Sequence, residues 1–217
     1  SHPGILHLYF HLMEMSPFPE KALRAGDRLR ELVPDAGHLV HMPTHIDILC
    51  GHYHDVLYWN RRAIEADRKY VERCGPMNIY TAYRLHNYHF AVYGAMFLGQ
   101  YAPALAAAEE IIAAVPEELL RIESPPMADF VESYLSMKQH VLIRFGKWRE
   151  IIAQEPPADP ALYANLVATM HYAKGVARAA IGEVDAAERE QARFLEARAK
   201  VPEGRLLHNN ACRDLLD

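Results

Sequence analysis

The sequence lacks the features that mark several large classes of protein. Its three cysteines, Cys50, Cys74 and Cys212, are widely spaced and form no CxxC pair, so we expect reduced thiols and no disulfide framework. No run of roughly 18 apolar residues is present, and the first residues show no basic segment followed by an apolar one. Neither a membrane-spanning helix nor a signal peptide is therefore predicted, and we expect a cytoplasmic protein.

Positive charge and the common nucleotide and hydrolase motifs are also scarce. Lys and Arg number 23 against 28 Asp and Glu, a net charge of −5, and no basic run is long enough to follow a phosphate backbone. We therefore expect neither nucleic acid nor a membrane as a partner. The sequence has no GxSxG, GxGxxG or Walker pattern, so nothing in it specifies an enzyme class.

A repeated pattern runs along the whole chain. Each copy opens with a Gly and an aromatic or apolar residue, continues with small residues at helical spacing, and closes near a Pro. The clearest copy is Gly99-Gln100-Tyr101, followed by Ala104, Ala108, Ile111 and Pro116. The small or apolar anchor of the second helix recurs at Ala22, Val56, Ala104, Ile151 and Ala187. This recurrence predicts paired helices throughout, without strands.

In this pattern the chain resembles the tetratricopeptide repeat family, whose units are helix-turn-helix pairs. The resemblance implies an all-α fold, an α-solenoid forming a single domain over residues 1–217. The repeats fall at residues 4–34, 38–74, 77–116, 126–155 and 159–200, with the start of a sixth at 205–217. The segments at 2–16 and 36–46 also resemble a group of bacterial tetratricopeptide proteins. Because the chain begins without Met and ends inside a helical-looking run, we expect a piece of a longer protein.

The repeats also predict where the helices lie. First helices are expected at residues 4–15, 39–50, 77–98, 127–145 and 160–181, and second helices at 19–33, 53–73, 102–114, 148–154 and 184–200. Most prolines fall at joints between helices, where a missing N–H costs nothing. Pro43 is the exception, and we expect it within the first turn of its helix or at a bend.

Histidines crowd into the first 89 residues, where ten of the thirteen lie. In a tetratricopeptide unit the first helix lines a concave groove, so the resemblance places eight imidazoles and one carboxylate on this surface. They are His7, His11, Glu14, His38, His41, His45, His86, His89 and His140.

The spacing of the histidines points to metal binding. His7 and His11 are four residues apart, as are His41 and His45, and two imidazoles at this helical spacing can chelate one ion. Nitrogen and oxygen donors suit zinc, iron, copper or manganese. We predict a divalent-metal site centred on His41 and His45. Its ligands are drawn from His7, His11, Glu14, His38, His41, His45, His86 and His89. Tyr93, Arg84 and His140 are predicted to contact a ligand or cofactor in the groove.

Three interpretations of the histidines stay open. They can hold one or two metal ions, with or without an enzymatic reaction at an open coordination position. They can instead form a metal-free groove that binds a peptide, a protein or a small molecule, as the fold resemblance implies. Or they can be hydrogen-bonded packing residues without a ligand. Metal analysis of the purified protein separates the first interpretation from the others.

Overall fold

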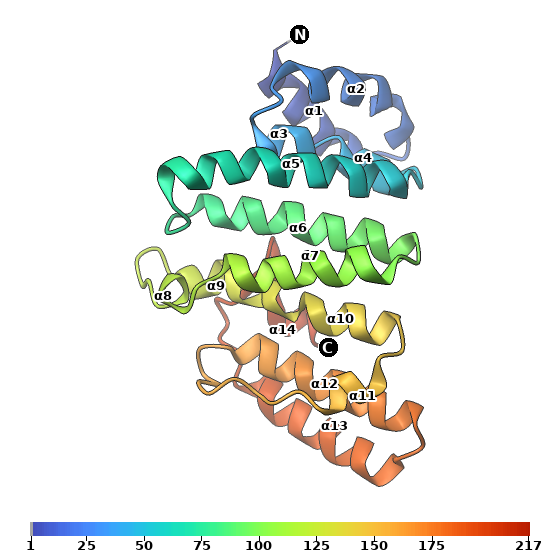
Figure 1. Ribbon diagram of the computed structural model, residues 1–217, viewed down its shortest axis with the longest axis vertical. Helices are drawn as coiled ribbons and strands as arrows, with labels where there is room; N and C mark the ends of the chain where they lie inside the picture. The colour runs from blue at the N-terminus through green and yellow to red at the C-terminus, as the bar shows by residue number, and fades with distance from the viewer. Residues whose placement is uncertain (1) are drawn as a thin grey trace. The chain divides into compact units, whose positions relative to one another are not determined.

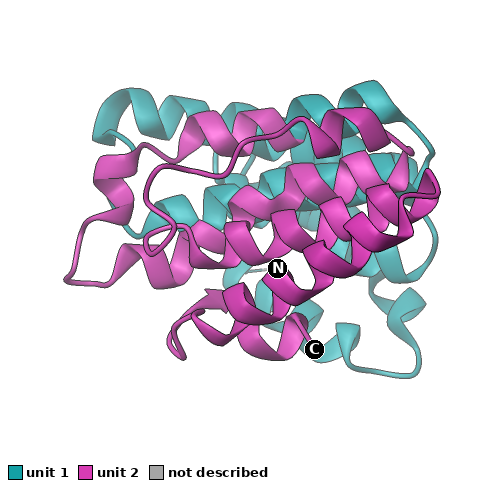
Figure 2. Cartoon of the chain, turned by 90° about the horizontal axis from the view of Figure 1, so that it is seen from below, with its two compact units in different colours: residues 1–107 teal, residues 108–217 magenta. Residues whose placement is uncertain are grey.

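The structure is a computed structural model that describes residues 2–217, and over these residues it is mostly helical (Figure 1). The prediction of an all-α protein is therefore confirmed. The chain divides into two compact units, residues 1–107 and 108–217, which are described separately below (Figure 2). Whether the units act as the single expected domain stays a prediction.

Unit 1 consists of helices that pack against near, but not always adjacent, helices in the chain. Its elements are α1 (Pro3–Glu14), the 3₁₀ turn η1 (Pro19–Ala22), α2 (Leu23–Leu32), α3 (Gly37–His41), α4 (Thr44–Leu49), α5 (Tyr53–Cys74), α6 (Tyr80–Phe97) and α7 (Tyr101–Ala114), which runs into unit 2. Helix α1 packs against α4, while α3 and α6 both pack against α5. A core of Phe10, Ala22, Leu29, Met42 and Ile46 joins α1, α2 and α4.

Glycines with positive φ separate the paired helices. Gly51, Gly99, Gly146 and Gly182 have φ angles of 80°, 69°, 65° and 85°, in the left-handed region that a residue without Cβ adopts readily. In each case the next helix begins two residues later, at Tyr53, Tyr101, Trp148 and Val184. These are the glycines that open the predicted copies, so the predicted joints lie at observed helix ends.

The helix expected at residues 39–50 is broken in two. Helix α3 ends at His41 and α4 begins at Thr44, with Met42 and Pro43 in a turn between them. Pro43 has no N–H to donate to the preceding turn. At the break, Oγ1 of Thr44 donates to the carbonyl of His41 at 2.7 Å. Pro43 therefore marks a break rather than a bend.

Helix α3 lies unusually close to α5. A Cβ placed on Gly37 would lie 2.1 Å from Oδ1 of Asp67 and 2.8 Å from the carbonyl oxygen of Ala63. Asp67 is itself buried, and its carboxylate accepts hydrogen bonds from the hydroxyl of Tyr80 and the amide of Asn87. The absence of a side chain at Gly37 therefore lets α3 pack closely on α5 while Asp67 of α5 keeps its hydrogen bonds to α6.

Unit 2 contains several short helices, one pair of long helices and a small hairpin near its end. Its elements after α7 are α8 (Glu117–Leu120), α9 (Met127–Val131), the 3₁₀ segment η2 (Glu132–Ser136), α10 (Met137–Arg144), α11 (Trp148–Ile152), α12 (Ala164–Ala180), α13 (Val184–Ala199), β1 (Leu206–Leu207), β2 (Asn210–Ala211) and α14 (Cys212–Leu215). The predicted helix at 127–145 is thus interrupted by η2. The predicted helix at 160–181 starts at Ala164.

The segment at 205–217 was expected to begin a sixth helical unit, but it forms the β1–β2 hairpin and α14. Buried Arg205 donates to the carboxylate of Glu132 at 2.9 Å, and the buried side chain of Cys212 packs near Ala164 and Ala168. These contacts hold the segment against η2 and α12 of the same unit.

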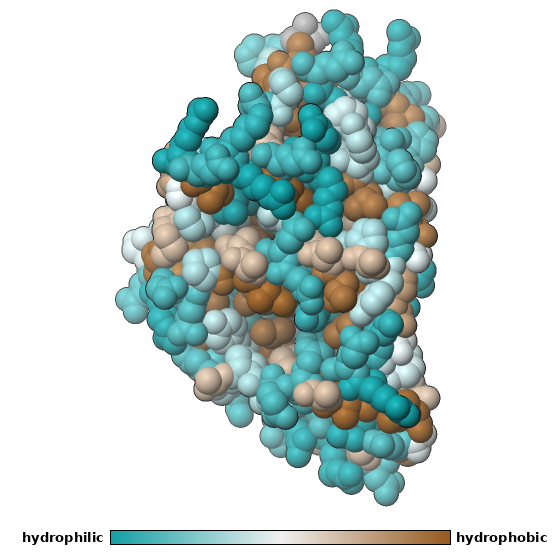
Figure 3. Space-filling view, in the orientation of Figure 1, coloured by the Kyte–Doolittle hydropathy of each residue, from teal (hydrophilic) through white to brown (hydrophobic). Residues whose placement is uncertain are grey.

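Polar side chains cover most of the face drawn in Figure 3, and apolar side chains show between them. This mixture is typical of amphipathic helices that turn one stripe to a core. Among the described residues, no helix has both the length and the apolar composition required to cross a bilayer.

Candidate metal centre

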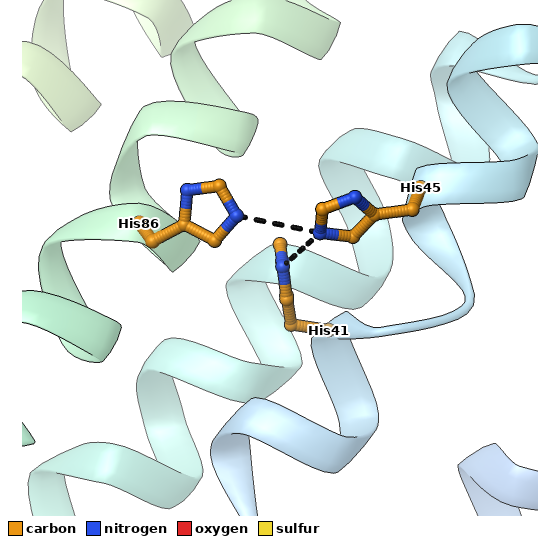
Figure 4. A group of neighbouring side chains, drawn as sticks. All are labelled: His41, His45 and His86. Carbon is orange, nitrogen blue, oxygen red and sulfur yellow. Dashed lines mark hydrogen bonds between the residues drawn. The ribbon is translucent and has the colours of Figure 1, made fainter. Parts of the chain in front are cut away.

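Three histidines from separate helices converge in unit 1. His41 is the last residue of α3, His45 lies in the first turn of α4, and His86 lies in α6 (Figure 4). The Nε2 atom of His45 is 2.9 Å from Nε2 of His41 and 3.3 Å from Nε2 of His86. These three residues, here called the inner group, have ligand atoms that all lie within 4.8 Å of one another, so they could hold a metal ion.

The inner group is almost completely removed from solvent. His41 is 0% exposed, His86 is 4% exposed, and the side chain of His45 is 12% exposed. The ring of Phe90 contacts all three imidazoles, with centroid distances of 4.8, 4.6 and 4.8 Å to His41, His45 and His86. An apolar wall of this kind weakens competition from water and strengthens electrostatic interactions within the group.

The proton on His41 is positioned by Asn60 of α5. Nδ1 of His41 lies 2.7 Å from Oδ1 of Asn60. The orientation of that amide is set on its other side, where Nδ2 donates to the carbonyl of Val56 at 2.7 Å and to Oγ1 of Thr44 at 3.1 Å. Since an amide oxygen only accepts, Nδ1 of His41 must carry the proton, and in the neutral ring Nε2 then presents a lone pair.

The proton on His45 is positioned in the same way by Glu14 of α1. Nδ1 of His45 lies 2.6 Å from Oε2 of Glu14, so it donates to the carboxylate. In their neutral forms His41 and His45 therefore direct two lone pairs at each other across 2.9 Å. Such a contact is repulsive unless a proton or a metal cation lies between the nitrogens. A metal-bound histidine usually donates a hydrogen bond from the ring nitrogen that does not bind the metal to a carboxylate or amide oxygen, which holds the ring in place.

Glu14 also links this group to His11 of its own helix. Its Oε1 accepts from Nδ1 of His11 at 2.7 Å, while Oε2 serves His45. Burial alone would raise the pKa of Glu14, but its hydrogen bonds and charge interactions with His45 and His11 outweigh burial and lower the pKa. Glu14 is therefore a carboxylate that supports two imidazoles at once.

A second set of imidazoles, here called the outer group, consists of His7, His11 and His38. Nε2 of His7 is 3.0 Å from Nε2 of His11 and 3.2 Å from Nε2 of His38. The edge of Tyr83 in α6 contacts the His38 ring at a centroid distance of 4.9 Å. Burial, followed by the neighbouring His11 and His45, lowers the pKa of His7. This group lies nearer to solvent, since the His11 side chain is 46% exposed.

The other predicted site residues are not members of the inner group. His89 is one turn further along α6 and stacks beside half-exposed Tyr93, with ring centroids 6.4 Å apart. Arg84 is buried and donates to Oγ1 of Thr81 on its own helix at 3.2 Å. His140 is exposed on α10 in unit 2. Helix α6 thus contributes one ligand to the inner group.

Sequence reasoning missed two residues of the site, Asn60 and Phe90. Asn60 lies on a second helix, whereas the repeat pattern directed attention to the first helices only. A signal was present, because Asn60 interrupts the apolar stripe of Val56, Ala63 and Ile64 and is 0% exposed. A buried amide needs hydrogen-bond partners, so its position predicts a polar neighbour. Phe90 has no comparable signal, since aromatic residues on such helices usually pack.

A further group, Asp47, His52 and Asp55, also has ligand atoms within 4.8 Å of one another. Asp47 is buried and already forms an ion pair with Arg30, while His52 and Asp55 are exposed. Because the guanidinium offsets the buried carboxylate, this group is a weaker candidate for a cation than the inner group.

No family model, curated protein or solved structure matches the chain. The function is therefore inferred from the geometry of the site itself.

Proposed function

We propose that this protein is a helical repeat protein whose first unit binds a divalent transition-metal ion through Nε2 of His41, His45 and His86. The observation that carries the proposal is the 2.9 Å contact between Nε2 of His41 and Nε2 of His45, two nitrogens whose rings are each held with the proton on Nδ1. A cation between them turns two opposed lone pairs into two bonds.

The distances between the ring nitrogens fit a shared ion. Two nitrogens bound at about 2.0–2.1 Å are about 2.9 Å apart at a right angle and about 3.3 Å apart at the tetrahedral angle. The His45 nitrogen lies at 2.9 and 3.3 Å from those of His41 and His86. Small adjustments of the rings would therefore suffice to coordinate one ion.

The donor set suits zinc, iron, copper or manganese. Three neutral imidazoles leave at least one coordination position for water or another ligand, as in zinc enzymes that use three protein ligands. Such an open position is compatible with a metal-dependent reaction as well as with storage or structural binding. The buried setting beside Phe90 restricts the open position to a small ligand.

The repeat interpretation of the whole chain is part of this proposal. The left-handed glycines at the starts of the copies, and the second helices that follow each of them by two residues, support tetratricopeptide-like units. In such units the inner group lies on first helices, the surface where this fold class commonly binds its ligands.

Metal analysis of the protein without a His-tag and without chelator tests the proposal. We expect about one equivalent of ion at the inner group, the occupancy that three imidazoles at one point imply. The double substitution His41→Ala and His45→Ala should remove that ion. His54→Ala is the matched control, because His54 is an exposed histidine of the same unit and its loss should leave the ion bound. Protein that contains no metal and gains no thermal stability from zinc, iron, copper, manganese or nickel would refute the proposal.

A metal-free groove for an organic ligand is the second candidate. The observation in its favour is that three aromatic rings on α6, those of Tyr83, Tyr93 and Phe97, are 45%, 40% and 47% exposed. Rings in such positions can stack on a ligand or on a peptide side chain. This candidate gains support if the metal analysis is negative.

A further inference from the structure

The outer group presents the same problem of opposed ring nitrogens as the inner group. Nε2 of His7 has two ring nitrogens close to it, that of His11 at 3.0 Å and that of His38 at 3.2 Å. His11 donates from Nδ1 to Glu14, so its Nε2 presents a lone pair in the neutral ring. The single proton that His7 can carry on Nε2 points along only one of its two short contacts.

We propose that His7, His11 and His38 hold a second divalent ion, so that unit 1 contains two neighbouring metal sites linked through Glu14. The inference deepens the proposed function and rests on it, because Glu14 supports His45 of the inner group and His11 of the outer group with its two oxygens. The ligands again come from different helices, two from α1 and one from α3.

The outer group is less compact than the inner group, because its three ligand atoms do not all lie within 4.8 Å of one another, so His11 or His38 would have to move closer to share an ion with His7. The nitrogen separations of 3.0 and 3.2 Å fall between the values of about 2.9 and 3.3 Å for two ligands of one ion at right and tetrahedral angles. His7 and His11 are one turn apart on α1, which is the spacing of helical histidine pairs in zinc sites. His38 closes the group from α3.

Charge makes the carboxylate essential to a pair of sites. The rings of His11 and His45 have centroids 6.1 Å apart, so two divalent ions held by these rings would repel each other. Glu14 lies between the two rings and accepts a hydrogen bond from each, so its negative charge would offset part of the repulsion between the ions. Because His11 is half exposed whereas His41 and His86 are buried, the outer ion should exchange faster and bind more weakly.

Counting bound ions tests the inference. Untagged protein is stripped with chelator, dialysed against cobalt(II) or zinc(II), and analysed for metal and protein. We expect two ions per chain at saturation, with one released to a competing chelator well before the other. His7→Ala should reduce the count to one, and that retained inner ion also shows that the variant is folded. His54→Ala should keep both ions.

The outcomes separate this inference from the proposed function. One ion in the wild type that survives in His7→Ala overturns the second site and leaves the inner site intact. Two ions in both proteins also overturn it, because the second ion then lies elsewhere. One ion in the wild type that is lost in His7→Ala means a single mixed site and overturns it as well. If His7→Ala fails to fold, the milder His11→Gln is judged by the same counts.

Discussion

The hydrogen bond between Asn60 and His41 offers the sharpest test of the inner group. The substitution Asn60→Leu keeps a side chain of similar length but removes the oxygen that accepts from Nδ1 of His41 at 2.7 Å. The carbonyl of Val56, which also loses the hydrogen bond from the Asn60 side chain, keeps its backbone hydrogen bond within the helix. The change therefore acts chiefly on the position of one proton in a ring that is 0% exposed.

Two effects of different size follow from the lost acceptor. A buried N–H without a partner costs about 1–3 kcal/mol, which sets an upper range for the loss of stability in the metal-free protein. The ring can reduce this cost by moving its proton to Nε2, where it would donate to His45. That tautomer blocks the metal, however, so the affinity should fall by about 10- to 100-fold, the usual effect of removing such a supporting partner.

The assay combines urea unfolding in chelator with a metal titration against a coloured chelator. Thr44→Val is the matched control, because it removes a buried hydroxyl bonded to Asn60 and to the His41 carbonyl but leaves the ring nitrogen's partner in place. We expect Thr44→Val to cost about 1 kcal/mol of stability and to change affinity by less than about threefold. If both variants change affinity equally, or neither does, the assigned proton position is wrong.

Three further predictions concern pH, packing and thiol reactivity. The metal-free protein should lose stability as the pH falls below about 6.5, because the pKa of His7 is lowered in the folded protein and the unfolded chain therefore binds this proton first. In His7→Gln, the free energy of unfolding measured in urea should depend less on pH. Gly37→Ala should cost about 3 kcal/mol or more, since the added Cβ would meet backbone and a buried carboxylate, whereas Gly175→Ala, with no neighbour closer than 3.7 Å, should be neutral or stabilising in thermal unfolding. Burial raises the pKa of Cys212 to about 11, so a disulfide reagent at pH 8 should label exposed Cys74 promptly and Cys212 only after unfolding.

The helix boundaries could be predicted well because they depend on local backbone chemistry. A glycine with positive φ ends a helix whatever packs around it, and the copies beginning at Gly51 and Gly99 show this directly. The break at Pro43 was predicted only in part. The local sequence is the same whether a proline lies in the first turn of a helix, bends the helix or separates two helices. The hairpin after Arg205 depends on a buried ion pair with Glu132, far away in the chain, and no local pattern reveals such a partner.

The candidate site could be predicted less completely than the fold. Helical spacing predicts His41 and His45 on one face of a single helix, whereas the break at Pro43 places them on two helices that still bring the rings together. The repeat offset brings in His86 from a later helix. The separation of the histidines into two groups was not predictable, because it depends on the break between α3 and α4 and on the side chain of Glu14 reaching two rings. Asn60 was missed because a motif directs attention to repeated positions, whereas a supporting residue need occur only once.

One ligand of the inner group, His86, lies far along the chain from His41 and His45, and this has a consequence for the unfolded state. His41 precedes α4 and α5, and His86 follows them, so an ion bound to both would close the chain into a loop around two helices. The described cysteines are free thiols, so the chain has no covalent link of this kind among them. For a disulfide, closing a loop of about 45 residues lowers the conformational entropy of the unfolded chain and so stabilises the folded state by about 4 kcal/mol. Metal binding should thus slow amide hydrogen exchange throughout α4 and α5, including in turns that lie far from any ligand.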